Sequence, residues 1–167
     1  MKPTNLCLVQ MGASGLEVID TYPNTLPNEV LRELAYKSMP LTAKPGDFAS
    51  ATMNEYSLSS YIFEVPQQDK RNNIASLVAV YSTMEYNPTE VKKAFTVIVE
   101  ELNKKDLLKM EVIKSILPNL QTGLSNRYFT MNISSQARIS FDFRSDDEKD
   151  VKTLDKRAEN VSDDLWR

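Results

Sequence analysis

Residue types able to perform acid–base, metal or nucleophilic chemistry are scarce in this sequence. None of its 167 residues is a histidine, which removes the usual general base and the usual nitrogen ligand of a metal. The one cysteine, Cys7, lies in the apolar run LCLV, whereas a reactive thiol needs a polar, electropositive setting. We therefore expect Cys7 to be a buried structural residue, and its lack of a partner favours a reducing compartment.

Two short motifs have residues that could hold an ion, but neither has the required pattern. The segment GASG at residues 12–15 lacks the lysine and the Ser or Thr of a phosphate-binding loop. The acidic cluster at 146–150 lacks the spacing and the glycine of a calcium loop. We interpret the first as a hairpin turn and the second as the start of a solvated helix. The sequence thus predicts no catalytic, cofactor-binding or metal site, and an enzyme of unrecognised type is only the remaining alternative.

The charge is distributed unevenly along the chain. The formal net charge is −3, and residues 145–167 hold eight acidic and five basic residues, which leaves residues 1–144 neutral. Neither part offers the basic face that a nucleic-acid backbone requires, so no nucleic-acid partner is expected. No apolar run reaches the roughly 20 residues of a membrane span, and the polar start does not open a signal peptide. We expect a cytoplasmic protein.

The hydrophobic periodicity predicts the order strand, strand, helix, three strands, helix, helix. The expected elements are strands at 5–11 and 16–22, a helix at 28–39, strands at 48–56, 58–65 and 74–82, a helix from Asn87 and Pro88, and a third helix capped by Asp106 that ends between Pro118 and Gly123. The strand at 74–82 has no polar face, so we expect both of its faces to be covered.

Two shorter patterns follow the third helix. The segments YFTMNI and ARISFDF alternate apolar and polar residues around the polar SSQ, which predicts two short strands. Their apolar residues are Phe129, Met131, Ile133, Ile139, Phe141 and Phe143. We expect this segment to lie against the domain, and a mobile tail is the alternative.

A heptad pattern occupies the end of the chain. Its apolar residues recur in steps of three and four and are Val151, Leu154, Ala158, Val161 and Leu165. This spacing is typical of a helix that lies along another helix. A terminal helix packed on its own domain or on a partner is the simplest interpretation.

The order of elements resembles the longin domain, a profilin-like sandwich of the vesicle-trafficking machinery. The resemblance covers about residues 4–122 and rests on the opening hairpin NLCLVQMGASGLEVIDTY, the apolar strand IASLVAVYS and the helix pair at 88–121. It implies a five-stranded, antiparallel-type mixed sheet with one helix on one face and two on the other. The expected organisation is a longin-like domain at 1–123, an extended segment at 124–144 and an acidic amphipathic helix or tail at 145–167.

The resemblance also implies a function. Longin domains are not enzymes; they act as adaptors or regulatory domains that bind small GTPases, other longin domains or SNARE helices. The expected contact residues are Leu31, Leu34, Tyr36, Phe48, Met53 and Tyr56, and core packing is the alternative for Leu31 and Leu34. Such partners would bring the protein to the cytosolic face of membranes. A roadblock-like, GTPase-regulating dimer is an alternative, although the roadblock fold begins with a helix.

A second alternative comes from the segment LDKRAENV, which resembles the second half of an R-SNARE helix. Asp147 stands where that family has its central arginine, which puts fusion activity in doubt. In this interpretation the protein is autoinhibited, and residues 129–143 occupy the groove of the first helix. The sequence leaves open which partner binds, whether two copies pair and whether a membrane anchor follows Arg167.

Overall fold

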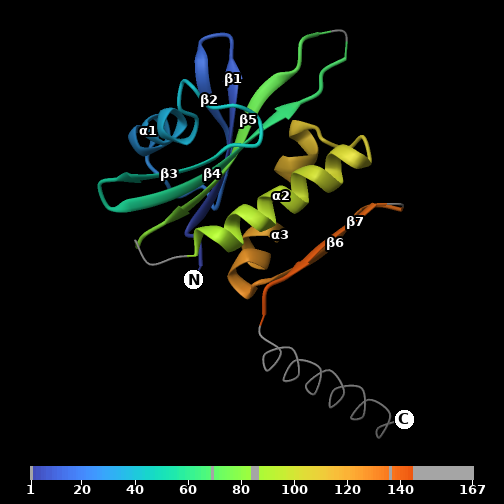
Figure 1. Ribbon diagram of the computed structural model, residues 1–167. Helices are drawn as coiled ribbons and strands as arrows, with labels where there is room; N and C mark the ends of the chain where they lie inside the picture. Colours follow the sequence, from blue (N-terminus) through green and yellow to red (C-terminus); the bar gives the residue numbers. More distant parts are fainter. Residues whose placement is uncertain (1, 69, 84–86, 136, 145–167) are drawn as a thin grey trace, which may run out of the picture.

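The computed structural model describes residues 2–68, 70–83, 87–135 and 137–144 (Figure 1). Its main sheet has five strands in the order β2-β1-β5-β4-β3, and every neighbouring pair is antiparallel. The strands are β1 (Asn5–Gly12), β2 (Gly15–Tyr22), β3 (Phe48–Met53), β4 (Tyr56–Val65) and β5 (Asn73–Tyr81). The predicted α/β class and the five strands of this sheet are confirmed, and the sheet is wholly antiparallel.

Helices cover both faces of this sheet. Helix α1 (Asn28–Ser38) lies on one face, while α2 (Pro88–Lys104) and α3 (Met110–Asn126) lie on the other. Strands β6 (Tyr128–Ser134) and β7 (Ala137–Asp142) form a separate hairpin outside α2 and α3 (Figure 1). The molecule therefore has four layers: one helix, the sheet, two helices and the hairpin.

The central strand β5 supports both faces. Leu77, Ala79 and Tyr81 point into the larger core beneath α2 and α3, whereas Val78 and Val80 point into the smaller core beneath α1. Successive side chains of a strand point to opposite faces, so a strand covered on both sides needs apolar residues throughout. This arrangement confirms the prediction made from the run IASLVAVYS.

The limits expected for the third helix are wrong. Lys109, not Asp106, is the residue before the first helical turn, and Asp106 has a left-handed backbone with φ 55°. The helix also continues through Pro118 to Asn126, so the domain boundary expected at Gly123 falls inside it. Proline removes one backbone hydrogen bond from a helix. Here the burial of Leu117, Leu120 and their neighbours against the sheet outweighs that loss.

The turn between β3 and β4 also differs from the expectation. The two strands are joined at Asn54 and Glu55 rather than at Ser57. Asn54 has φ 46°, and asparagine tolerates this left-handed conformation better than most residues. Propensity alone did not distinguish this turn, because the residues on either side of it, 49–52 and 57–60, are mostly Ala and Ser, which do not mark a strand end clearly.

The two strands predicted after the third helix are confirmed, and they lie against the domain as expected. Phe129, Ile139 and Phe141 are buried in the larger core against α2 and α3, and Met131, Ile133 and Phe143 pack half-buried beside them. The groove of α1 lies on the other side of the sheet. The autoinhibited alternative, in which residues 129–143 fill that groove, is therefore wrong on this point, because the apolar side of the hairpin is already covered by α2 and α3.

The close seat of the hairpin depends on Gly123. A Cβ atom at this position would lie 2.7 Å from Cδ2 and 2.8 Å from Cβ of Phe129, so only glycine lets the ring rest directly on the helix backbone. In the part of the chain that the structure describes, no helix is long and apolar enough to cross a membrane. The heptad residues at 151–165 and the expected acidic helix or tail lie outside the described residues.

Candidate functional site

A groove of about 410 Å³ lies between α1 and the turn that joins β3 to β4. Its lining consists of Val30, Glu33, Met53, Asn54, Glu55 and Tyr56. Val30 and Glu33 are one helical turn apart, so they lie on the same side of α1. The apolar part of the lining comes from Val30, Met53 and Tyr56, and two carboxylates stand beside it. The groove can accept an apolar side chain of a partner.

The predicted contact residues fall into different places. Met53 and Tyr56 line the groove, and Met53 is only 2% exposed. Leu34 is fully buried in the smaller core and Leu31 packs half-buried against it, so their contribution is to hold α1 on the sheet. Tyr36 is 68% exposed on α1 and lines no part of the groove.

The prediction placed Phe48 on the wrong face of the sheet. It pairs with Tyr61 across β3 and β4, and both side chains pack on the α2 and α3 side. The Nζ atom of Lys92 lies 6.0 Å from the centroid of the Phe48 ring, within cation–π range. Strand alternation gave the signal that was missed, because Phe48 and Met53 are five residues apart and such residues face opposite ways.

Four lining residues were missed: Val30, Glu33, Asn54 and Glu55. Asn54 and Glu55 were assigned to the last residues of the strand expected at 48–56, so their exposure at a turn was not expected. Glu33 forms an ion pair of 3.1 Å with Lys37, whose Nζ also donates a 2.6 Å hydrogen bond to the carbonyl of Thr52. This bridge ties α1 to β3 and keeps the groove in shape.

The sheet has two edge strands, and they differ in protection. Strand β2 carries Glu17 and Asp20, and its pairing with β1 is interrupted by a bulge at Leu8 and Val9. Strand β3 reads FASATM, without a charge or a proline. Charges and bulges normally prevent an edge from pairing with another chain. The bare edge of β3, beside the groove, is therefore the less protected of the two edges.

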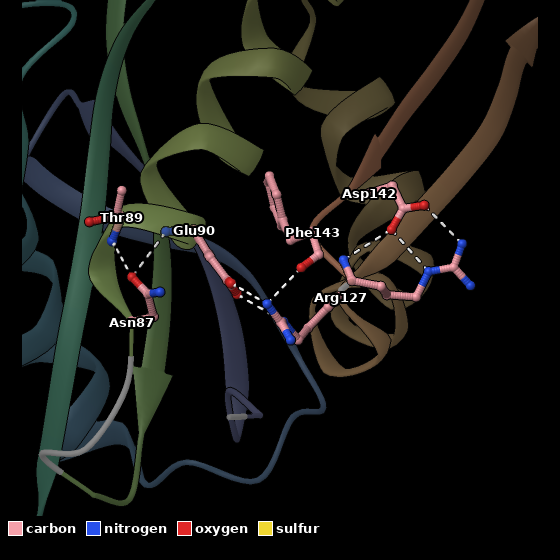
Figure 2. A network of polar contacts seen from close by, with 7 residues as sticks. Asn87, Thr89, Glu90, Arg127, Asp142 and Phe143 are labelled. Carbon is pink, nitrogen blue, oxygen red and sulfur yellow. Dashed lines mark hydrogen bonds and ion pairs between the residues drawn. The ribbon is translucent and has the colours of Figure 1, made fainter. Parts of the chain in front are cut away.

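A polar network at the base of the hairpin has a structural role (Figure 2). Arg127, in a left-handed conformation at the end of α3, contacts both carboxylate oxygens of Glu90 at 2.7 and 3.3 Å. Its guanidinium also donates a 2.6 Å hydrogen bond to the carbonyl of Phe143. Asn87 accepts hydrogen bonds from the amides of Thr89 and Glu90 and so caps α2. The network joins α2, α3 and the end of β7.

The one cysteine side chain is fully buried. Burial raises the pKa of the Cys7 thiol to about 12, although a hydrogen bond with Thr21 opposes this shift. A thiol with such a pKa is not a nucleophile near neutral pH. Within the described residues, no cluster of three or more acidic or cysteine side chains is placed to hold a metal ion.

A scan of the sequence against models of known protein families gives no match, and a search of curated proteins gives none either. The likeness to a longin domain therefore rests on the order of the elements and on their layers, and it remains a prediction.

Proposed function

We propose that this protein is a non-enzymatic, longin-type adaptor or regulatory domain that binds a small GTPase or another longin-type domain in membrane trafficking. The observation that supports it is the groove between α1 and the β3–β4 turn, which lies beside the bare edge of β3. A partner can use both features together, because one offers an apolar pocket and the other is an edge strand without charges.

The chemistry of the two features defines the contact. An extended segment that adds to a sheet edge gains main-chain hydrogen bonds, while pockets for its side chains provide specificity. Met53 belongs to both features, because it lines the groove and is the last residue of β3, while Tyr56 lines the groove from the first position of β4. We expect Tyr56 to contribute most to binding, because half-buried aromatic residues dominate interfaces of this kind. The exposed Tyr36 would extend the contact along α1.

The same edge supports a second candidate, a roadblock-like dimer. A strand without charges is compatible with a second copy of itself, because no like charges meet when two β3 strands pair antiparallel. The mass of the protein in solution, measured by light scattering, distinguishes the candidates. A dimer that is lost on Ser50→Lys supports self-pairing, and a monomer overturns it.

The adaptor proposal is tested by binding to purified small GTPases and longin domains, with each GTPase loaded with GDP or with a GTP analogue. We expect nucleotide-dependent binding that falls at least tenfold with Val30→Asp in the groove and with Ser50→Lys on the β3 edge. Glu55→Lys, at an exposed lining position, is a second groove variant that spares the core. Ser140→Lys on the exposed side of β7 is the matched control and should leave binding unchanged.

Thermal melting of each variant establishes that it is folded. Absence of binding to every GTPase and longin domain in both nucleotide states would refute the adaptor proposal. Binding that neither the groove variants nor the edge variant weakens would also refute it.

A further inference from the structure

A charge from another element reaches the free edge of β3. Lys37, in the last turn of α1, extends its side chain to the end of β3, where its Nζ donates a 2.6 Å hydrogen bond to the backbone carbonyl of Thr52. The same Nζ lies 3.1 Å from a carboxylate oxygen of Glu33, one turn earlier on the helix. Helix α1 and strand β3 lie beside each other in Figure 1. The ammonium group is therefore held between its counterion and the strand.

The carbonyl of Thr52 points away from β4, towards the free edge. The amide of Ile62 in β4 donates a hydrogen bond to the carbonyl of Asp47, and the pairing then runs without a bulge from Phe48 to Met53. In an antiparallel pair, successive residues direct their backbone groups alternately towards the partner strand and away from it. Thr52 follows Asp47 by five positions, so its carbonyl faces outward, where Lys37 caps it.

This cap changes what the edge can bind. Strand β3 has six residues, so only Phe48, Ser50 and Thr52 direct backbone groups outward, and Thr52 is the one beside the groove. An incoming strand that pairs with Thr52 must take over its carbonyl and cover the ammonium of Lys37. A hydrogen bond from a charged donor is roughly twice as strong as a neutral one, and a covered charge without an acceptor is costly. Lysine is accordingly a common protection of sheet edges.

We infer that Lys37 guards the β3 edge against pairing with a second copy of this chain. The inference rests on the proposed use of this edge as a pairing surface, and it adds which strand is excluded. Strand β3 contains neither a charge nor a proline, so its protection must come from a neighbouring element. Lys37 is that element's contribution, and it is placed at the outward carbonyl nearest the groove.

A second copy has no group ready to accept the displaced ammonium. When two β3 strands pair antiparallel about Ser50, Thr52 of one lies opposite Phe48 of the other. The six residues of β3 include no carboxylate, and the side chain of Asp47, just before them, already accepts a 2.8 Å hydrogen bond from the amide of Lys44. A partner that reaches Thr52 must instead bring its own acceptor for the ammonium.

The test is sedimentation velocity of the full chain at rising protein concentration. We expect the wild-type chain to remain a monomer. Lys37→Met keeps the length of the side chain but removes the charge, and it should lower the dissociation constant for self-association at least about tenfold, because the charge-assisted hydrogen bond no longer opposes pairing. Ser50→Lys in the Lys37→Met background returns a charge to the edge and should restore the monomer. Lys37→Arg keeps a cationic donor and should also remain a monomer.

The matched control is Lys93→Met, which removes one positive charge at an exposed position of α2 and should remain a monomer. Melting curves should show that all variants are folded. A monomeric Lys37→Met, equal association of Lys93→Met, or association that Ser50→Lys does not reverse would overturn the inference. A wild-type chain that already dimerises through β3 would also overturn it, in favour of the roadblock-like dimer.

The cap itself is checked by NMR of the lysine ammonium groups. The signal of Lys37 should exchange with water more slowly than that of the exposed Lys93, because its protons are held by Thr52 and Glu33. Equally fast exchange would overturn the inference. None of these measurements uses a GTPase or a longin domain, so a failure of the guard is distinguishable from a failure of the adaptor proposal, which depends on binding to those proteins.

Discussion

The two faces of the main sheet are built to different depths. Helix α1, of 11 residues, covers one face alone, and a small core lies beneath it. The other face carries two 17-residue helices and then the β6–β7 hairpin, which together enclose the larger core. The thin face leaves a groove at the end of β3 and an exposed Tyr36. Extra layers thus stabilise one face, and their absence leaves the other available for binding.

The thick face is also the more tightly constrained. Phe129 rests on Gly123, its ring stacks on Phe141 at 5.4 Å, and Arg127 joins the base of the hairpin to α2. On the thin face, α1 is tied to β3 by the bridge from Lys37 to Glu33 and Thr52, whose charged side chains are well exposed. We expect the two faces to differ most in how they respond to the loss of one side chain.

The largest effect is expected from Phe129→Ala. This change leaves a cavity between the hairpin and α3, so the free energy of unfolding should fall by about 3–5 kcal/mol. Urea denaturation followed by circular dichroism measures the loss. Ser140→Ala, on the exposed side of the same hairpin, is the control and should change stability by less than about 0.5 kcal/mol. If Phe129→Ala were equally harmless, the hairpin would not be a layer of the core.

Leu34→Ala makes the corresponding change on the thin face. We expect a loss of about 2–4 kcal/mol, because Leu34 is fully buried. Amide hydrogen exchange should then accelerate in α1 while α2, α3 and the hairpin keep their protection. Uniform acceleration across the molecule would show that the two faces unfold as one unit, and the comparison would fail.

Gly123→Ala tests the seat of the hairpin through the sign of its effect. In an ordinary helix interior this change is stabilising by about 1 kcal/mol. Here the new methyl group meets Phe129, so we expect a loss of roughly 1–3 kcal/mol. Repeating the substitution in the Phe129→Ala background should remove the cost. A loss that persists without the ring would place its cause elsewhere.

Glu90→Gln removes one partner of the ion pair with Arg127. The pair is partly exposed, at 36% for Arg127 and 25% for Glu90, so the expected loss is about 1 kcal/mol or less and should shrink as salt increases. Glu100→Gln, at an exposed position of the same helix, provides the comparison for the loss of a carboxylate. An equal loss in both variants would mean that the Arg127 contact adds nothing specific.

Cys7, in the core beneath α1, should affect the pH dependence of stability only at alkaline pH. Its pKa is raised from 9.0 to about 12 in the folded protein, so between these values the unfolded chain loses a proton that the folded chain keeps. Stability should therefore fall as the pH rises from about 9 towards 12. Cys7→Ala should show a shallower fall over this range in denaturation curves. Parallel curves for both proteins would contradict the burial of the thiol.

Much of the fold follows from local pattern. The opening hairpin, the apolar run of β5 and the spacing of Val91, Phe95 and Ile98 in α2 indicated their elements correctly, because period and turn chemistry are written in neighbouring residues. The third helix was predicted to end between Pro118 and Gly123 because proline and glycine are local signals for the end of a helix. Its continuation depends on burial against β1, β2 and Phe129, which no local pattern contains.

The groove was less accessible to sequence reasoning. It combines α1 with a turn whose position was misjudged, and Phe48 was assigned to the wrong face.

By itself, the sequence determined the class of the fold, the helices and most strands, and the buried state of Cys7, since hydrophobic periodicity and composition decide these locally. Only the tertiary structure decided on which side of the sheet the β6–β7 hairpin packs, and which residues line the groove. From its sequence alone, the apolar face of the hairpin could pack on any apolar helix surface. The hairpin packs on α2 and α3 because Arg127 links it directly to the end of α3 and because Gly123 leaves space for Phe129 against the helix backbone.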